Sequence, residues 1–356
     1  MDILIILLIT LCLWGAEFSA RGHDDYAGRE QTTAVKGIFA LLILLSHSRG
    51  YLDPEACAAN GFLFTLLLDK LGQLIVVMFM FYSGYGIMEA LKRDRRHYIA
   101  TFPTRRLLKV WLLFAIAVAL YVLLNLALGN SYPAGHILLS FTGWTSIGNS
   151  NWFVFVILAL YLLTYVAMLA ADRLGLSQRF IVAATYVLTA LLLAGLVAAG
   201  KEVYWYDTML SYPTGMLFST LKPRIEHALR GRRWLIAALA VAALFAACYA
   251  AGPYTPLTAR PDATIIRRWA FHLAAPCLFA LLVVMLTMKL RIHNPLLYRI
   301  GVDAFAIYIL QRLAMIAGAR LGLNSSPLLF VAAVTAATLL IAALYTKATK
   351  RLLTRK

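Results

Sequence analysis

Charged side chains are scarce in this sequence. They make up 14% of its 356 residues, whereas 62% are hydrophobic and the mean hydropathy is +0.77. A water-soluble domain carries roughly 25% charged residues, so this composition argues against one. Apolar stretches of about 18 residues recur along the chain, and each is long enough to cross a ~30 Å hydrocarbon core as a helix. The short alternating segments typical of a membrane β-barrel are missing. The sequence therefore predicts an all-α, polytopic integral membrane protein.

Cysteines with metal-binding or redox spacing are missing as well. The four cysteines, Cys12, Cys57, Cys248 and Cys277, are widely separated, and three of them fall in apolar stretches. Such cysteines usually pack as small apolar side chains, so we expect no metal site. The sequence also has no internal repeat and no pair of broken apolar stretches in equivalent positions. Both are features of inverted-repeat transporters.

Acidic residues number 16 against 33 basic ones, which gives a net charge of +17. The basic excess is concentrated in alternate connections between the apolar stretches, such as 91–109, 222–233 and 347–356. This is the positive-inside pattern of membrane proteins. It predicts a multi-pass protein of the plasma (inner) membrane with its amino terminus outside and its carboxyl terminus in the cytoplasm. The charge then reflects topology, so we expect membrane lipids and no nucleic acid around the chain.

About 10–11 transmembrane helices are expected, and we place them at 3–20, 35–51, 71–91, 107–128, 152–171, 180–199, 203–221, 234–252, 270–288, 296–317 and 327–346. The chain starts Met1-Asp2, without the basic start of a signal peptide, so the first stretch is taken as a mature helix. The predicted organisation is an extra amino-terminal helix at 1–20, a transmembrane domain at 30–346 and a basic cytoplasmic tail at 347–356.

One pair of polar residues marks a line through the membrane. Lys36 and His47 lie in the stretch AVKGIFALLILLSHSRGY, eleven residues apart. At 100° per residue they share one helical face, and at 1.5 Å per residue they are about 16 Å apart along the axis. A phosphate-binding cation near the cytoplasm and an imidazole deep on the same face suit an extended donor such as acyl-coenzyme A. The alternative is a snorkelling lysine and a structural histidine.

The next cytoplasmic connection adds candidate phosphate ligands. Arg105 and Arg106 lie in FPTRRLLKVW, where we expect a helix to begin. Arginine forks bind phosphate in a bidentate manner, and a helix amino end would add its dipole. Simple anchoring in the membrane surface is the competing interpretation, and for Lys92 to Arg96 it is the preferred one.

Six segments together resemble the membrane-bound acyltransferase 3 family. The segment KGIFALLILLSH resembles the family's basic-x10-His signature, and five further segments follow in the family's order: MFMFYSGYGI (78–87), FPTRRLLKVW (102–111), NWFVFVILALYLLTY (151–165), WYDTMLSYPTGMLFS (205–219) and IGVDAFAIYILQRL (300–313). The resemblance covers residues 30–345. It implies an enzyme that moves acyl groups, often acetyl, from cytoplasmic acyl-coenzyme A to hydroxyls of cell-surface glycans or lipids.

The resemblance also implies roles for individual residues. His47 corresponds to the catalytic histidine, Lys36 to the basic partner, and Arg105 and Arg106 to a cytoplasmic arginine pair. Many members have arginine in place of Lys36, so the charge is kept but the bidentate fork is lost. As a general base, His47 would take the proton of the acceptor hydroxyl, while a covalent acyl-histidine is the alternative.

Acceptor-binding candidates lie at the outer side. Asn151 and Trp152 start the fifth predicted helix, and Asp207 lies beside Tyr204 and Tyr206. Amides, carboxylates and aromatic faces suit sugar rings, whereas an interfacial aromatic belt is the alternative for the nearby Trp144. Asp303, Tyr308, Gln311 and Arg312 form a second polar line, either structural or functional.

Two other classes of function remain. A transporter or flippase of a lipid-linked glycan or small molecule would need buried charges along several helices, and here they are few. A structural membrane subunit would not need His47. The sequence favours a membrane acyltransferase with acetyl-coenzyme A as co-substrate and a glycan or glycolipid acceptor.

Overall fold

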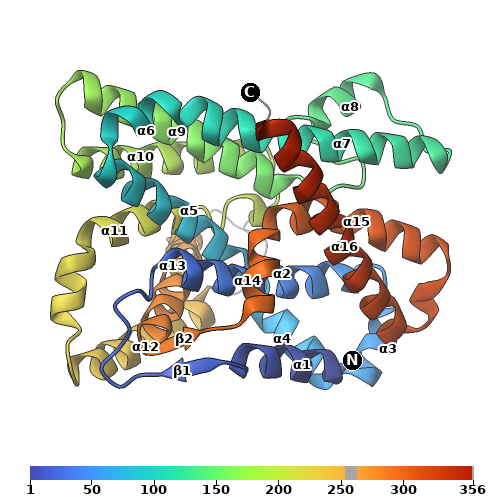
Figure 1. The fold of residues 1–356 in the computed structure, drawn as a ribbon, viewed down its shortest axis with the longest axis horizontal. Coiled ribbons are helices and arrows are strands. Elements are labelled where there is room, and N and C mark those ends of the chain that lie inside the picture. The colour runs from blue at the N-terminus through green and yellow to red at the C-terminus, as the bar shows by residue number, and fades with distance from the viewer. Residues whose placement is uncertain (253–262, 355–356) are drawn as a thin grey trace.

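The computed structural model describes residues 1–252 and 263–354. The fold is a helical assembly in which long helices pack in layers (Figure 1). In the described residues, strand is confined to β1 (Ala16–Phe18) and β2 (Leu290–Ile292), so the predicted all-α class is confirmed. The helices are α1 (Asp2–Leu13), α2 (Arg29–Arg49), α3 (Pro54–Asn60), α4 (Phe62–Leu71), α5 (Leu74–Arg93), α6 (Arg95–Phe102), α7 (Lys109–Ala127), α8 (Ala134–Ser140), α9 (Trp152–Arg173), α10 (Gln178–Ala198), α11 (Ser211–Ala228), α12 (Arg233–Ala251), α13 (Ala263–Lys289), α14 (Pro295–Val302), α15 (Ala304–Arg320) and α16 (Pro327–Thr354).

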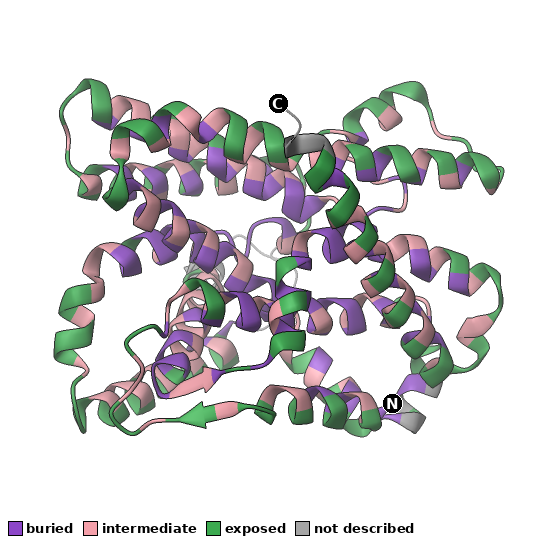
Figure 2. Cartoon of the chain, viewed as in Figure 1, coloured by how far each residue is buried: buried purple, intermediate pink, exposed green. Residues whose placement is uncertain are grey.

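Within the described ranges, seven helices are long and apolar enough to cross a membrane. An eighth is added if α14 and α15, which meet at an angle of 77°, form one bent span. The most peripheral of the seven is α12, where 6% of the apolar window is buried inside the protein. Leu235, Ile236 and Leu239 on that helix are exposed, as expected of a lipid-facing surface (Figure 2). The polytopic membrane architecture is therefore confirmed.

The amino-terminal segment differs from its prediction. Helix α1 ends at Leu13 after 12 residues, which corresponds to about 18 Å, and is followed by a turn at Gly15 and by β1. Residues 3–20 therefore do not form one helix across a ~30 Å core. β1 instead pairs antiparallel with β2, which follows α13.

Of the predicted helices at 35–51 and 203–221, the first is present as α2 and the second needs correction. Helix α2 covers the first region but carries several charged residues and is mostly buried within the assembly. It packs against α5, α14, α15 and α16, so neighbouring helices rather than lipid surround it. In the second region, residues 203–205 form a 3-10 turn and α11 begins only at Ser211.

Glycines set two close helix crossings. Gly37 of α2 and Gly301 of α14 lie against each other's helix backbone, at Leu297 and Thr33 respectively. Gly84 of α5 meets the carbonyl oxygen of Tyr212 of α11. Gly215 of α11 meets that of Phe81 of α5 in the same way. A side chain at any of the four glycines would collide with backbone, so the small residues let these helices approach closely.

The region expected to be a cytoplasmic loop is helical. Helices α6 and α7 continue into each other through a π-helical turn at Pro103–Leu108, and together they form a 33-residue helix, Arg95–Ala127. Arg105 and Arg106 lie inside this turn. The expected helix start at these arginines is therefore wrong, and a helix dipole cannot assist them there.

Candidate functional site

A cavity of about 750 Å³ lies along one face of α2. Four α2 residues line it, at spacings that keep them on one side of the helix: Arg29, Thr32, Lys36 and Ile43. From Arg29 to Ile43 the helix rises about 21 Å. Most of the remaining wall comes from α5, α9, α14 and α15, with further residues from the segment before α2, the π-helical turn, α7 and α11. The cavity is therefore elongated along the axis of α2, the helix that carries both Lys36 and His47.

One part of the cavity is rich in basic groups. Arg29, Lys36, Arg93, Arg106 and Lys222 all line it, although they come from four different elements. Lys36 lies within electrostatic range of both Arg29 and Arg106. Cations gathered in this way repel one another, and a phosphate-bearing ligand would relieve that repulsion.

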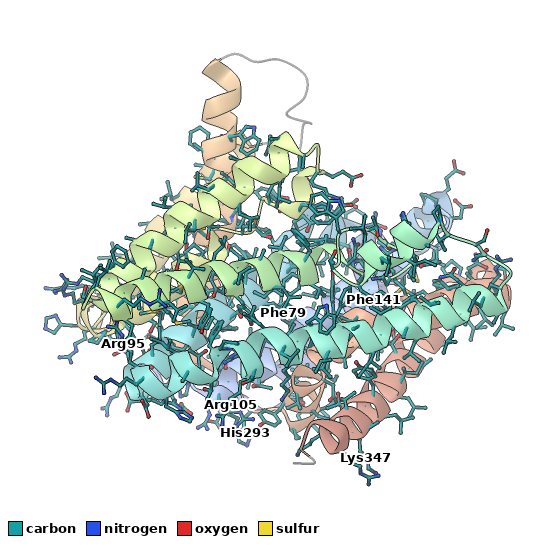
Figure 3. The ribbon with its side chains drawn as sticks, turned by 90° about the horizontal axis from the view of Figure 1, so that it is seen from above. Phe79, Arg95, Arg105, Phe141, His293 and Lys347 are labelled. Atoms are coloured by element: carbon teal, nitrogen blue, oxygen red, sulfur yellow. The ribbon has the colours of Figure 1, made fainter. Side chains whose placement is uncertain are left out.

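The two neighbouring arginines of the π-helical turn have different surroundings. Arg106 is half-buried, lines the cavity and lies within electrostatic range of Tyr98 and Tyr161. Arg105 is exposed and lies near the lower edge of the molecule in Figure 3, whereas Phe79, which lines the cavity, lies well inside its outline. The structure thus brings Lys36 and Arg106 together and leaves Arg105 at the surface.

His47 lies one helical turn beyond Ile43, next to the apolar end of the cavity. Its Nδ1 is 2.7 Å from Nε2 of Gln311 on α15. Its ring is 6.2 Å from the ring of Tyr308, which lines the cavity and packs against Phe153 at 5.4 Å. Tyr308 therefore lines the cavity and packs beside the imidazole.

Hydrogen bonds fix the orientation of the Gln311 amide. Its Nε2 donates to the carbonyl oxygen of Tyr308 at 3.1 Å and lies 3.5 Å from Oγ of Ser150. Donation to Nδ1 of His47 as well means that the neutral ring carries its hydrogen on Nε2. The amide oxygen of Gln311 is buried and has no hydrogen-bond partner among the described residues. Rotation of the amide would place that oxygen against Nδ1 and allow the other tautomer.

Asn151 and Trp152, which the sequence predicts on the outer side, lie at the start of α9. Asn151 donates from Nδ2 to the carbonyl oxygen of Gly143 at 2.8 Å, which holds the preceding loop. Trp152 packs its ring against that of Tyr204 at 5.7 Å. Asn151 thus has a structural role in holding this loop, and Trp152 packs with Tyr204 in an aromatic cluster.

Trp144 belongs to a second aromatic group, one that is covered by a cation. Nζ of Lys201 lies 3.7 Å from the centre of the Trp144 ring and 4.2 Å from that of Trp205. Partial burial lowers the pKa of Lys201, and the nearby Glu202 opposes this shift. Since the lysine already covers this ring face, Trp144 is better explained as part of the loop structure than as a sugar platform.

Asp207 lines a separate hollow of about 320 Å³, together with Asp69, Gln73 and Tyr204. The residue is 2% exposed, and its Oδ2 lies 3.6 Å from Nε2 of His272. Its Oδ1 is buried and makes no hydrogen bond within the described part of the chain. A buried carboxylate oxygen at the wall of a hollow can accept a hydrogen bond from a hydroxyl.

Asp303 lies at the bend between α14 and α15. Its Oδ2 pairs with Nε of Arg299 at 3.3 Å, one turn earlier in the chain. This ion pair lies at the 77° change of direction between α14 and α15, beyond which Tyr308 lines the cavity and Gln311 contacts His47.

Several site residues were not singled out from the sequence. Arg29 precedes Lys36 by seven residues, so helical periodicity alone could have placed it on the same face. Ser83 and Tyr161, whose oxygens are 2.6 Å apart, line the cavity from two helices that are distant in sequence. No local pattern predicts such a pair, since it depends on how α5 and α9 pack.

The comparisons with known proteins give one result that covers the site. No curated protein and no solved structure matches the chain. A family model described as an acyltransferase domain matches residues 32–347, a range that contains Lys36, Arg106, His47 and Tyr308. With the membrane-spanning helices, this match shows that the chain belongs to the acyltransferase 3 family and is a multi-pass membrane acyltransferase.

Proposed function

We propose that this enzyme transfers an acyl group, foremost acetyl, from cytoplasmic acyl-coenzyme A to a hydroxyl of a cell-surface or lipid-linked glycan in the plasma (inner) membrane. The elongated cavity carries the proposal, because it joins Lys36 and Arg106 to Tyr308, which contacts His47. Phosphates of the donor bind the basic part. The pantetheine arm runs along α2, and the thioester lies next to Tyr308 and His47.

His47 acts as the general base in this proposal. In this step the Gln311 amide is rotated from its observed orientation, so that its oxygen accepts a hydrogen bond from Nδ1, which carries the ring hydrogen. Nε2 is then free to take the proton of the acceptor hydroxyl. The acceptor oxygen attacks the thioester carbonyl carbon, and a tetrahedral intermediate forms. When it collapses, the C–S bond breaks and the thiolate of coenzyme A takes the proton from His47. The other chemistry is a covalent acyl-histidine, in which Nε2 itself attacks the thioester.

The acceptor is assigned to the outer side. The hollow at Asp207 offers an unsatisfied carboxylate oxygen, and Tyr204 connects it through ring packing to Trp152. A polyhydroxylated acceptor provides hydroxyl donors for the carboxylate and apolar ring faces for the aromatic side chains. Asn151 acts indirectly, because it fixes the loop that precedes Trp152.

The test uses purified protein in lipid nanodiscs with acetyl-coenzyme A labelled in its acetyl group. We expect the label to appear in a membrane-glycan extract, or as free acetate released by slow hydrolysis of the donor. His47→Ala should lower this rate by about 10²- to 10⁴-fold. His227→Gln, at an exposed histidine on α11, serves as the matched control. Unchanged transfer by His47→Ala would refute the base assignment. Absence of label movement in the wild type, with flux of a glycolipid across vesicles, would favour a transporter.

A further inference from the structure

A segment outside the matched family region forms part of the cavity mouth. The amino-terminal arm, residues 14–28 between α1 and α2, precedes the family match, which begins at residue 32. Four arm residues nevertheless line the cavity: Asp24, Asp25, Ala27 and Gly28. The two aspartates are exposed at this edge of the cavity. Tyr26, the residue that follows them, is buried. The arm therefore contributes a wall to the candidate donor site.

Backbone hydrogen bonds fasten the arm to the end of α13. In the β1–β2 pair, Ala16 is opposite Ile292 and Phe18 is opposite Leu290. Beyond the strand, the amide of Ser19 donates to the carbonyl oxygen of Lys289 at 2.9 Å. The amide of His23 donates to the carbonyl oxygen of Met288 at 2.9 Å. An arm held along its length in this way has a fixed position relative to the cavity.

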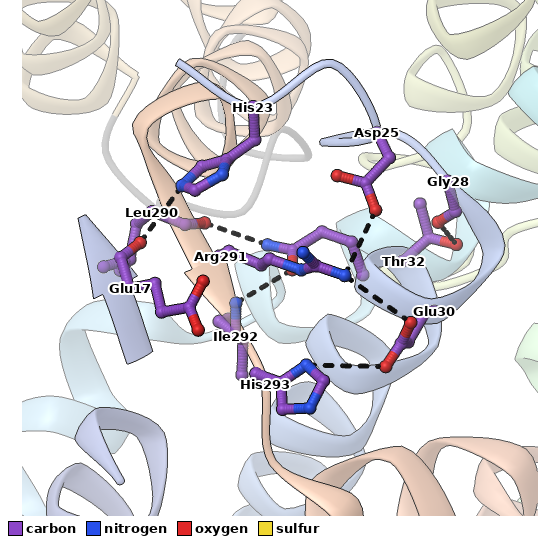
Figure 4. A network of polar contacts seen from close by, with 11 residues as sticks. Glu17, His23, Asp25, Gly28, Glu30, Thr32, Leu290, Arg291, Ile292 and His293 are labelled. Atoms are coloured by element: carbon purple, nitrogen blue, oxygen red, sulfur yellow. Dashed lines mark hydrogen bonds and ion pairs between the residues drawn. The ribbon is translucent and has the colours of Figure 1, made fainter. Parts of the chain in front are cut away.

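Charged groups fix the last part of the arm. Arg291 of β2 lies 3.5 Å from a carboxylate oxygen of Asp25 and 3.8 Å from one of Glu30. Glu30 in turn lies 3.6 Å from Nδ1 of His293 (Figure 4). Arg291 thus connects the arm, the start of α2 and β2. Removal of this one cation would leave Asp25 without its ion-pair partner.

The two arm carboxylates are opposite in charge to the basic side chains that line the cavity, and Glu89 of α5, which pairs with Lys92, is a third carboxylate there. Arg29, Arg93, Arg106 and Lys222 provide cations that suit phosphate groups. Carboxylates repel phosphate and accept hydrogen bonds from hydroxyl and amino groups. The nucleotide end of coenzyme A presents both kinds of group, since its phosphates are attached to a ribose and an adenine.

We propose that the amino-terminal arm binds the nucleoside part of the acyl-coenzyme A donor, with Asp24 and Asp25 accepting hydrogen bonds from its hydroxyl and amino groups. The basic side chains beside them bind the phosphates. This inference rests on the proposed function, in which acyl-coenzyme A is the donor. The arm is then a specificity element that separates the full donor from a thioester without a nucleotide.

The test compares two donors in full-length protein in nanodiscs, namely acetyl-coenzyme A and S-acetyl-pantetheine. For the double variant Asp24→Ala/Asp25→Ala we expect the KM for acetyl-coenzyme A to rise about tenfold, since hydrogen bonds to charged groups are lost. The KM for S-acetyl-pantetheine should not change. Arg291→Ala should act in the same direction because it loosens the arm. Glu17→Gln changes an exposed carboxylate in β1 and serves as the matched control.

Three outcomes separate the possibilities. A rise in KM for acetyl-coenzyme A alone supports the arm as a nucleoside site. An unchanged KM for acetyl-coenzyme A, or an equal rise for both donors, overturns it. A wild-type protein that uses S-acetyl-pantetheine but not acetyl-coenzyme A overturns the proposed donor, and with it the inference. Thermal unfolding midpoints of all variants show whether the fold is kept.

Discussion

Arg105 and Arg106 show how much a shift of one residue matters inside a helix. They are neighbours in sequence, and both were predicted to bind the donor. In the π-helical turn they point into different environments, so that only Arg106 lines the cavity and Arg105 is exposed. A charge at the surface is screened by water and salt, whereas one at a cavity wall interacts with a ligand at short range.

This difference leads to a paired prediction. Arg106→Gln should raise the KM for acyl-coenzyme A by about 10- to 100-fold, because a charge-assisted hydrogen bond contributes about 1.5–3 kcal/mol. Arg105→Gln should change it by less than about threefold, as expected of an exposed charge. Steady-state kinetics on both purified variants gives the comparison. Equal effects would show that Arg105 also reaches the donor.

Gln311 is predicted to orient the ring of His47, the proposed general base. Replacing its amide by a carboxylate, in Gln311→Glu, provides an acceptor for the Nδ1 hydrogen and stabilises the charged imidazolium. The acid limb of the pH–rate profile should therefore move to higher pH, by on the order of one unit. Gln311→Leu should lower kcat by about tenfold or more with little change in the donor KM, since the tautomer is no longer fixed.

The measurement is kcat against pH for the wild type and both variants. A purely structural role of Gln311 predicts a lower yield of folded protein but no displacement of the acid limb. Identical profiles for the wild type and Gln311→Glu would therefore count against the orienting role.

At the residue scale, the sequence was informative where one helix carries the site. Lys36 and His47 are both on α2, so helical periodicity alone put them on one line, and the cavity follows that face. Tyr308 and Gln311 were visible only as a polar line on another helix. Their contact with His47 depends on the 77° bend at Asp303, which no periodicity contains.

At the element scale, the close crossing of α5 and α11 requires a glycine at positions 84 and 215, and this requirement can be tested. Gly84→Ala or Gly215→Ala puts a methyl group against a carbonyl of the facing helix, so α5 and α11 must separate. We expect a loss of about 1–3 kcal/mol in stability, the usual cost of overpacking. Thermal unfolding in detergent would show it as a lower midpoint.

Gly195→Ala is the control for this experiment. Gly195 lies in the last turn of α10, and apart from the nearby backbone of that helix a Cβ there meets no described atom within 4 Å. Since alanine favours helix over glycine by about 0.8–1.0 kcal/mol, this variant should be as stable as the wild type or more stable. A Gly84→Ala variant that behaves like Gly195→Ala would show that the close approach is not needed.

The element boundaries show why hydropathy succeeded in some places and failed in others. It identified the peripheral helices, such as α12, because lipid contact requires apolar side chains over their whole length. It overestimated the length of the helix predicted at residues 3–20. There the turn at Gly15 and the pairing of β1 with β2 end the helix early. For α2 it indicated a helix correctly, but burial among other helices permits the charges that lower its hydropathy.

At the scale of the whole molecule, the cavity and the charge distribution together predict how the protein is oriented across the membrane. The basic part of the cavity is formed where α2 begins and α5 ends, beside connections rich in Lys and Arg. The positive-inside rule predicts that these connections face the cytoplasm, where acyl-coenzyme A is made available. His47, near the other end of α2, would then act toward the outer side, where glycans are assembled.

This orientation can be tested by cysteine accessibility. In a variant whose four native cysteines are replaced by serine, Ser131→Cys would report on the α7–α8 connection and Ser177→Cys on the α9–α10 connection; both positions are exposed. A membrane-impermeant maleimide should label position 131 in intact cells, and position 177 only after permeabilisation. These are matched changes, since each replaces one exposed serine. The reverse pattern would place the basic part of the cavity outside, away from any cytoplasmic donor. Then a cytoplasmic donor could not enter the cavity at its basic end. Lys36 and Arg106 would bind an anionic ligand other than acyl-coenzyme A.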